Sequence, residues 1–241
     1  MSLLARLVGH NGIRPCRICN IRGICAPGGK TNYVPLDRSL HPAARQDPTQ
    51  IKTYNPMKSQ AEEVEFASST NLSKTLATEY GIKGLSIFMS ISSMVFPVCL
   101  PYDFMHLIFE NVMKNLVLLW TGQFKGLDEG SGDYEIDKGT WKAVGAATSA
   151  SGPYIPSAFG AGPPNVADDK KAQTADSWSF WLLYLGPVLL EKSFKRRIYY
   201  SHYIKFVKLV KFCLEFEYER QNIEVIQQGW IKWVEDFEDR R

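Results

Sequence analysis

Three cysteines and a histidine near the start of the chain have the spacing of a metal-binding loop. Cys16 and Cys19 form a C-x-x-C pair, and His10 and Cys25 stand on either side of it. A C-x-x-C turn brings two thiolates close enough to bind one tetrahedral zinc ion. Five residues on each side leave room for His10 and Cys25 to complete the ligand set. These four residues could bind structural zinc; because no second C-x-x-C follows, a locally packed loop with buried free thiols is the favoured alternative.

A second polar group is expected on one face of a helix. Asp103, His106, Glu110 and Lys114 follow each other at spacings of three, four and four, within a segment that is otherwise apolar. Asp103 and His106 could bind a metal or orient one another. The alternative is that Asp103 caps the helix and Glu110 pairs with Lys114.

A third group combines cations with aromatic rings. The six cations are Lys195, Arg196, Arg197, Lys205, Lys208 and Lys211. Tyr199, Tyr200 and Tyr203 are interleaved with them. Cations neutralise phosphates and rings stack on bases, so this block predicts a DNA-binding surface. The alternative is a solvated helix face whose tyrosines are buried.

The amino-acid composition excludes several classes of protein, and the uneven distribution of charge along the chain indicates which partners to consider. The 241 residues are 45% hydrophobic and 22% charged, which excludes wholesale disorder and a disulfide scaffold. The net charge of +3 conceals blocks: residues 1–60 hold nine Lys/Arg against two Asp/Glu, residues 192–211 hold seven Lys/Arg and no acid, and residues 215–241 hold eight acids against four bases. Such basic blocks bind a polyanion or pair with the acidic block inside the fold. The sequence has no phosphate-binding glycine motif and no nucleophile with a base at motif spacing, so the residues alone indicate neither an enzyme nor a small-molecule substrate.

The hydrophobic pattern predicts a mainly helical protein with long Gly/Pro-rich loops. Strand signals are few. We expect an irregular basic region with the cysteine loop over 1–60, a helical region over 61–241, and a flexible linker at 122–172. The predicted helices are a short one capped by Ser73, then 101–120, 138–150, one that begins at Thr174 or Asp176, 198–219 and 223–239. The apolar run 85–100 is too short to span a membrane and predicts buried soluble structure.

Several stretches together resemble CACTA (En/Spm-type) DNA transposases, in particular the fungal branch. The matching stretches, in family order, are LVGHNGIRPCRICNIRG, LPYDFMHLIFENVMKNLVLLWTGQFKGLDEG, GAATSASGPYIPSAFG, TADSWSFWLLYLGPVLL and YYSHYIKFVKLVKFCLEFEY. The C-x-x-C of the family matches Cys16 and Cys19, and its D-x-x-H matches Asp103 and His106.

The resemblance implies a fold and a reaction. Such transposases cut DNA with three carboxylates on a ribonuclease-H-like (DDE) fold that holds two Mg²⁺ or Mn²⁺ ions. The matched segments belong to the largely helical insertion between the second catalytic Asp and the final Glu. The resemblance therefore implies a truncated transposase-derived protein without most of the catalytic sheet, inactive in cutting, and nuclear as its full-length parent would be. The alternatives are a residual DNA-binding module and a small zinc-binding interaction protein.

Overall fold

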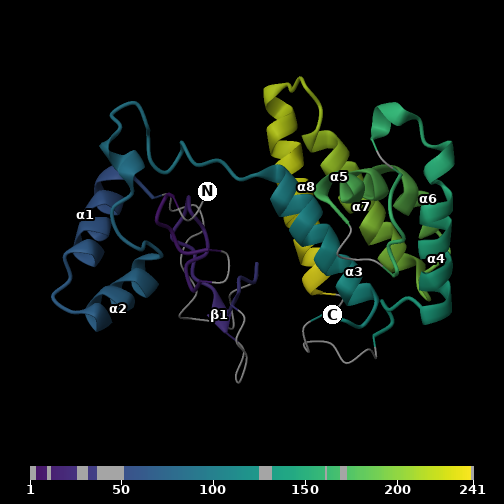
Figure 1. Cartoon of the computed structure of the whole chain (residues 1–241), viewed down its shortest axis with the longest axis horizontal. Helices are drawn as coiled ribbons and strands as arrows, with labels where there is room; N and C mark the ends of the chain where they lie inside the picture. Colours follow the sequence, from purple (N-terminus) through teal and green to yellow (C-terminus); the bar gives the residue numbers. More distant parts are fainter. Residues whose placement is uncertain are drawn as a thin grey trace. The chain divides into compact units, whose positions relative to one another are not determined.

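The computed structural model is mainly helical, as the sequence predicts, and its described strands form one two-stranded sheet (Figure 1). The structure describes residues 4–9, 12–25, 32–36, 52–124, 132–160, 162–168 and 173–239. Internal contacts divide the chain into two compact units, Met1–Pro101 and Tyr102–Arg241. The expected boundary at residue 60 falls inside helix α1 (Tyr54–Glu65).

The first unit contains the small sheet and two α-helices. Strand β1 (Ile24–Cys25) pairs antiparallel with β2 (Asn32–Tyr33), so that Ile24 lies opposite Tyr33. Helix α1 is followed by α2 (Thr70–Tyr80) and by the 3₁₀-helix η2 (Ile87–Ser90). The core of this unit consists of Ala5, Leu7, Met57, Ala61, Ile82, Met89, Phe96 and Leu100.

Local chemistry explains where α2 begins and ends. The hydroxyl of Ser69 accepts a hydrogen bond from the Leu72 amide at 3.2 Å, so Ser69 and not Ser73 caps the helix. Ser73 lies one turn inside α2 and donates to the Val64 carbonyl of α1 at 3.0 Å, which ties the two helices together. The helix ends at Gly81, whose φ of 70° is the left-handed conformation that glycine adopts without strain.

The apolar run 85–100 is only partly buried, which corrects the expectation from its composition. Met89, Phe96 and Leu100 lie in the core, whereas Val95 and Val98 are exposed. Its one helical piece is a single turn of 3₁₀-helix, which turns its apolar side chains in several directions. Within the described ranges, no helix has both the length and the apolar character needed to cross a membrane.

The second unit is built from helices that pack around one aromatic core. In chain order the helices of more than one turn are the π-helix η3 (Met105–Met113), α3 (Lys114–Trp120), α4 (Lys138–Ala150), α5 (Ala175–Phe180), the π-helix η6 (Trp181–Leu185), α6 (Gly186–Leu189), α7 (Arg197–Cys213) and α8 (Arg220–Glu238). Helix η3 continues directly into α3, and α5, η6 and α6 also follow each other without a break. Helix α8 lies alongside α7 and α3 (Figure 1).

Two of the predicted helix starts, those of α4 and α5, are confirmed by their caps. The Asp137 carboxylate accepts from the amides of Gly139 and Thr140 at the start of α4. Thr174, the first of the two predicted candidates, caps α5 in a capping box with Ser177.

The predicted helix over 198–219 ends earlier, at Cys213. The acids Glu215, Glu217 and Glu219 follow directly, and negative charge is unfavourable at the carboxyl end of a helix dipole. Tyr218 donates instead to the Phe212 carbonyl at 2.5 Å, so its hydroxyl satisfies one of the carbonyls at the end of α7.

Trp181 is the centre of the second unit's core. It is 1% exposed, and its indole Nε1 donates to the buried Thr148 hydroxyl of α4 at 3.0 Å. Its ring meets Trp141 and Trp178 edge to face, with centroids 6.2 and 6.1 Å apart. Helix α7 adds Tyr203, whose hydroxyl donates to the Leu182 carbonyl at 2.8 Å. The core is thus aromatic, and the polar atoms of Trp181 and Tyr203 are hydrogen-bonded within it, whereas the buried Trp141 Nε1 has no hydrogen-bond partner among the described residues.

Replacing Phe206 tests this core. Phe206 is completely buried on α7, and Phe206→Ala should lower the free energy of unfolding of the second unit by about 3–5 kcal/mol, because it leaves a cavity. The control is Phe216→Ala, since Phe216 is fully exposed and its loss should change stability by less than about 0.5 kcal/mol.

Urea unfolding followed by tryptophan emission measures both variants. The emission reports on the second unit alone, because all six tryptophans lie in it: Trp120, Trp141, Trp178, Trp181, Trp230 and Trp233. Equal destabilisation by the two substitutions would contradict the packing described.

Candidate functional site

The C-x-x-C pair forms a tight turn whose backbone amides point at one sulfur. The amides of Ile18 and Cys19 donate to Cys16 Sγ at 3.4 and 3.2 Å. Successive amides aimed at one atom form a small concavity that favours a negative charge. A hydrogen bond with Cys16, followed by burial, raises the pKa of the Cys19 thiol well above its usual range. The two sulfurs of the turn therefore have different surroundings, since the amide hydrogen bonds are directed at Cys16 Sγ.

Lys52 completes this group, and it lies 36 residues away from Cys16 in the sequence. Lys52 is only 4% exposed. Its ammonium group donates a hydrogen bond to the Cys16 carbonyl at 3.1 Å, and its backbone amide donates to the Ile18 carbonyl at 2.7 Å. Burial lowers the pKa of Lys52, while the neighbouring cysteines act in the opposite direction. No local pattern of residues predicts this contact, because it depends on where the chain returns after residue 51.

The structure brings together two of the four expected zinc ligands. Cys16 and Cys19 share the turn, whereas Cys25 is an exposed residue of β1, and His10 lies outside the described residues. The described parts of the chain gather no group of three or more His, Cys, Asp and Glu side chains. Two thiols suit one half of a tetrahedral zinc site.

Asp103, His106 and Glu110 do lie together, at the start of η3. Asp103 Oδ2 is 2.6 Å from His106 Nδ1, and Glu110 Oε2 is 3.5 Å from His106 Nε2. Asp103 also caps the helix, because its Oδ1 accepts from the His106 amide at 3.2 Å. The expected Glu110–Lys114 pair is wrong: Glu110 faces His106 instead. Both imidazole nitrogens face carboxylates, and the hydrogen bond between Nδ1 and Asp103 orients the ring.

The electrostatics of this group follow from its geometry. The hydrogen bond to Asp103, and then the charges of Asp103 and Glu110, raise the pKa of His106. The same hydrogen bond lowers the pKa of Asp103. All three side chains are about half exposed. The helix here is a π-helix, and the side-chain amide of Asn111 donates to the His106 carbonyl at 2.6 Å.

The six cations around α7 divide into two classes. Two of them pair with acids: Lys205 Nζ is 2.7 Å from Asp236 Oδ2, and Arg196 Nη1 is 3.6 Å from Asp133 Oδ2. The other four, all exposed, form no ion pair among the described residues: Lys195, Arg197, Lys208 and Lys211. Part of the block is thus paired with acids of the same unit, and part is left exposed to solvent.

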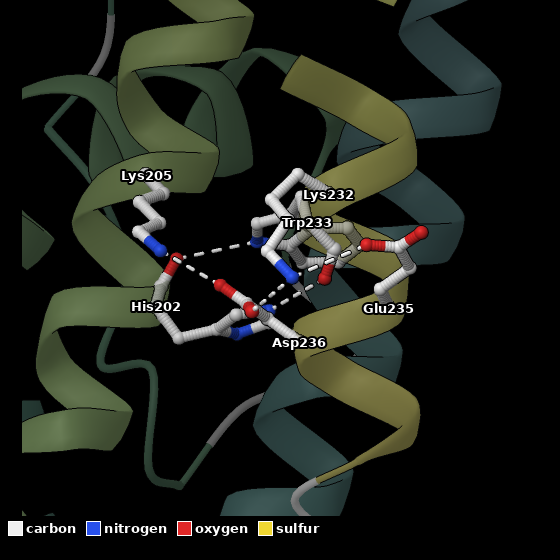
Figure 2. A network of polar contacts seen from close by, with 6 residues as sticks. All are labelled: His202, Lys205, Lys232, Trp233, Glu235 and Asp236. Carbon is white, nitrogen blue, oxygen red and sulfur yellow. Dashed lines mark hydrogen bonds and ion pairs between the residues drawn. The ribbon is translucent and has the colours of Figure 1, made fainter. Parts of the chain in front are cut away.

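The Lys205–Asp236 pair belongs to a network that joins α7 to α8 (Figure 2). The Asp236 carboxylate is 7% exposed and also meets Lys232 Nζ at 3.5 Å. Beside it, His202 and Trp233 exchange hydrogen bonds with each other's backbone carbonyl, at 2.9 and 3.2 Å. Their rings stack with centroids 4.7 Å apart. Lys205 therefore has a structural role in joining α7 to α8. The sequence alone did not distinguish Lys205 from the neighbouring lysines of α7.

The interleaved tyrosines face inwards, contrary to a role as base-stacking rings. Tyr203 is completely buried, and Tyr200 donates to the Pro187 carbonyl at 2.7 Å. Tyr199 is half-buried and packs near Phe194 and Tyr134. A cavity of about 30 Å³ lies beside this group, lined by side chains that include Trp120 and His202. It has room for water, whereas a small-molecule site takes roughly 300–1,000 Å³.

Comparison with known proteins adds no relative. No protein-family model matches the chain, and neither a curated protein nor a solved structure resembles it significantly. Function must therefore be argued from the residues and their geometry.

Titration of His106 tests the carboxylate bridge. We expect the pKa of His106 to lie above that of an ordinary histidine, and Asp103→Asn to lower it towards the ordinary value. Glu110→Gln should lower it less, because that carboxylate is farther from the ring. Since the folded pKa is raised, protonated His106 stabilises the folded state at pH values below the ordinary histidine pKa, and this contribution disappears as pH rises through the raised value.

The measurement is ring-proton NMR across pH, with the resonance assigned through His106→Gln. A His106 pKa that Asp103→Asn leaves unchanged would show that the pair does not persist in solution.

Proposed function

We propose that this chain is a DNA-binding module of CACTA-type transposase descent. The resemblance of its segments, in family order, to the helical insertion of those enzymes supports the descent, and a mainly helical structure is what such a region requires. In this proposal the protein works in the nucleus, and its partner is DNA.

The observation that carries DNA binding is the set of unpaired cations on and before α7. Lys195, Arg197 and Lys208 are exposed and form no ion pair among the described residues. Lys208 stands on the solvent face of a helix whose opposite face is buried, which holds its backbone rigidly. Cations held on a rigid element neutralise phosphates without regard to base sequence.

In this proposal the chain binds DNA without cutting it. Two-metal cleavage needs several carboxylates around a pair of Mg²⁺ or Mn²⁺ ions. The described residues gather no such group, and the carboxylates of Asp103 and Glu110 are turned towards His106. A role for these residues in metal-dependent cleavage is accordingly not proposed.

Charge-matched variants test DNA binding. The triple variant Lys195→Ala, Arg197→Ala, Lys208→Ala should weaken binding to a labelled 20-base-pair duplex roughly tenfold or more at 100 mM salt, and should make the dependence of log Kd on log salt shallower by about two to three. The control removes three other exposed lysines of the same unit, Lys114, Lys138 and Lys142. It changes the net charge equally and should alter binding by less than about threefold.

Fluorescence anisotropy measures both triple variants, and incubation of supercoiled plasmid with Mg²⁺ or Mn²⁺ measures cutting. If the two triple variants lose affinity equally, only net charge matters and the proposed surface is wrong. Robust metal-dependent nicking by the purified chain would overturn the assignment as a non-cutting module.

A second candidate, a zinc-binding interaction protein, is favoured by the geometry of the cysteine turn. Amides directed at Cys16 Sγ, with Cys19 in the same turn, suit a pair of metal-bound thiolates. The remaining ligands would come from Cys25, His10 or a partner. This candidate is compatible with DNA binding, since Cys16 and Cys19 belong to the first unit and α7 belongs to the second.

Metal analysis tests the zinc site. Protein purified without chelator should contain about one equivalent of zinc, and Cys16→Ser or Cys19→Ser should reduce this to below about a tenth. Cys99→Ser and Cys213→Ser are the controls, because neither cysteine belongs to the C-x-x-C motif, and both substitutions should leave the zinc content unchanged. Less than about a tenth of an equivalent in the unsubstituted protein would dismiss the site.

A further inference from the structure

Three aromatic rings of the second unit form a cluster on its surface. Phe159 lies in the 3₁₀-turn η5 (Ser157–Phe159), Phe180 ends α5, and Tyr184 lies one turn later in η6. The ring centroids are 5.6 Å apart for Phe159–Phe180, 5.6 Å for Phe159–Tyr184 and 5.2 Å for Phe180–Tyr184. Each ring thus contacts the other two, and we call these three residues the ring platform.

The ring platform is solvent-accessible and stands apart from the aromatic core. Phe159 is 47% and Tyr184 50% exposed, and none of the three belongs to the buried cluster around Trp181. Val188, one helical turn after Tyr184, is 73% exposed and extends the apolar surface. Phe180 is half-buried, and the three ring planes are inclined to one another by 36° to 68°, so Phe159 and Tyr184 supply the ring faces that a partner can cover.

A cation from a third segment lies on the ring platform. Lys211 Nζ of α7 is 5.6 Å from the centroid of the Tyr184 ring. Lys211 forms no ion pair among the described residues, and Lys208, one turn earlier on α7, is also exposed and unpaired with any acid. Lys211 thus gives the platform a positive border, and the Asp176 carboxylate lies beside Gly160, the residue after Phe159.

We propose that the ring platform, with Lys211 and Lys208, is a binding site for single-stranded DNA. Its rings stack on unpaired bases, and its lysines neutralise the adjoining phosphates. The positive border selects a polyanion as occupant, and the exposed rings select one whose base faces are accessible, which excludes an intact duplex. This inference rests on the proposed DNA binding and specifies the form of DNA that this surface takes.

Ring-deletion variants test the site in the full chain. Phe159→Leu combined with Tyr184→Leu keeps apolar volume and removes two stacking faces. It should weaken binding to a labelled 20-nucleotide oligo-dT at least about tenfold, and binding to a 20-base-pair duplex by less than about twofold. The control is Tyr154→Leu combined with Phe216→Leu, two rings of the same unit that are more exposed than the platform rings, which should change neither affinity. Lys211→Gln should weaken oligo-dT binding and make its salt dependence shallower by about 0.7.

A cross-linking measurement on the unsubstituted protein does not depend on the folding of any variant. Irradiation of bound oligonucleotide carrying 5-iodouracil, followed by mass spectrometry, should place the cross-link on Phe159, Phe180 or Tyr184. Cross-links confined to other residues would overturn the site.

Other outcomes separate this proposal from the one on which it rests. If the duplex is bound through Lys195, Arg197 and Lys208 but the ring and control variants bind oligo-dT equally, the platform proposal fails and the proposed function stands. If neither form of DNA is bound, both fail. Binding of a matched oligo-U RNA at least tenfold more tightly than oligo-dT would overturn the assignment to DNA.

Discussion

Burial of one stripe of α7 is the constraint on which the second unit depends. His202, Tyr203, Phe206, Val207 and Val210 occupy that stripe, and each is less than a tenth exposed. Their spacing of three and four places them on one side of the helix, where they meet the core around Trp181 and, through His202, helix α8. Once this side is buried, Lys205, Lys208 and Lys211 lie on the exposed side of α7, while Ile204 and Leu209 are partly buried against the core.

The surroundings of each lysine then decide what it does. Lys205 points along the seam with α8 and meets the buried Asp236, whose charge would be costly inside the protein without a cation. Lys208 lies one turn later, away from that acid. Lys211 reaches the ring of Tyr184. Three lysines at identical spacing thus have three different environments, which divides a uniform basic block into a structural part and a part available to a polyanion.

Several helices, caps and contacts elsewhere in the chain depend on residues that are close together in the sequence. The helix over 101–120, the caps at Asp137 and Thr174 and the amphipathic last helix could be predicted, because each depends on residues within a few positions of one another. The D-x-x-H pair could be predicted to touch for the same reason. The sequence could not predict that Glu110 pairs with His106 and not with Lys114. Both residues are four positions from Glu110, and the local helix is a π-helix.

Taken alone, the sequence determined that the chain is mainly helical, that it carries a C-x-x-C turn and that its cations cluster near residues 195–211. These properties depend on local spacing and composition. Tertiary structure alone decided that Lys52 returns to Cys16, that Asp236 holds Lys205 and that Phe159 joins Phe180 and Tyr184 beside Lys211. Each of these contacts joins residues more than twenty positions apart, and such residues meet only where the packing of the core brings their segments together.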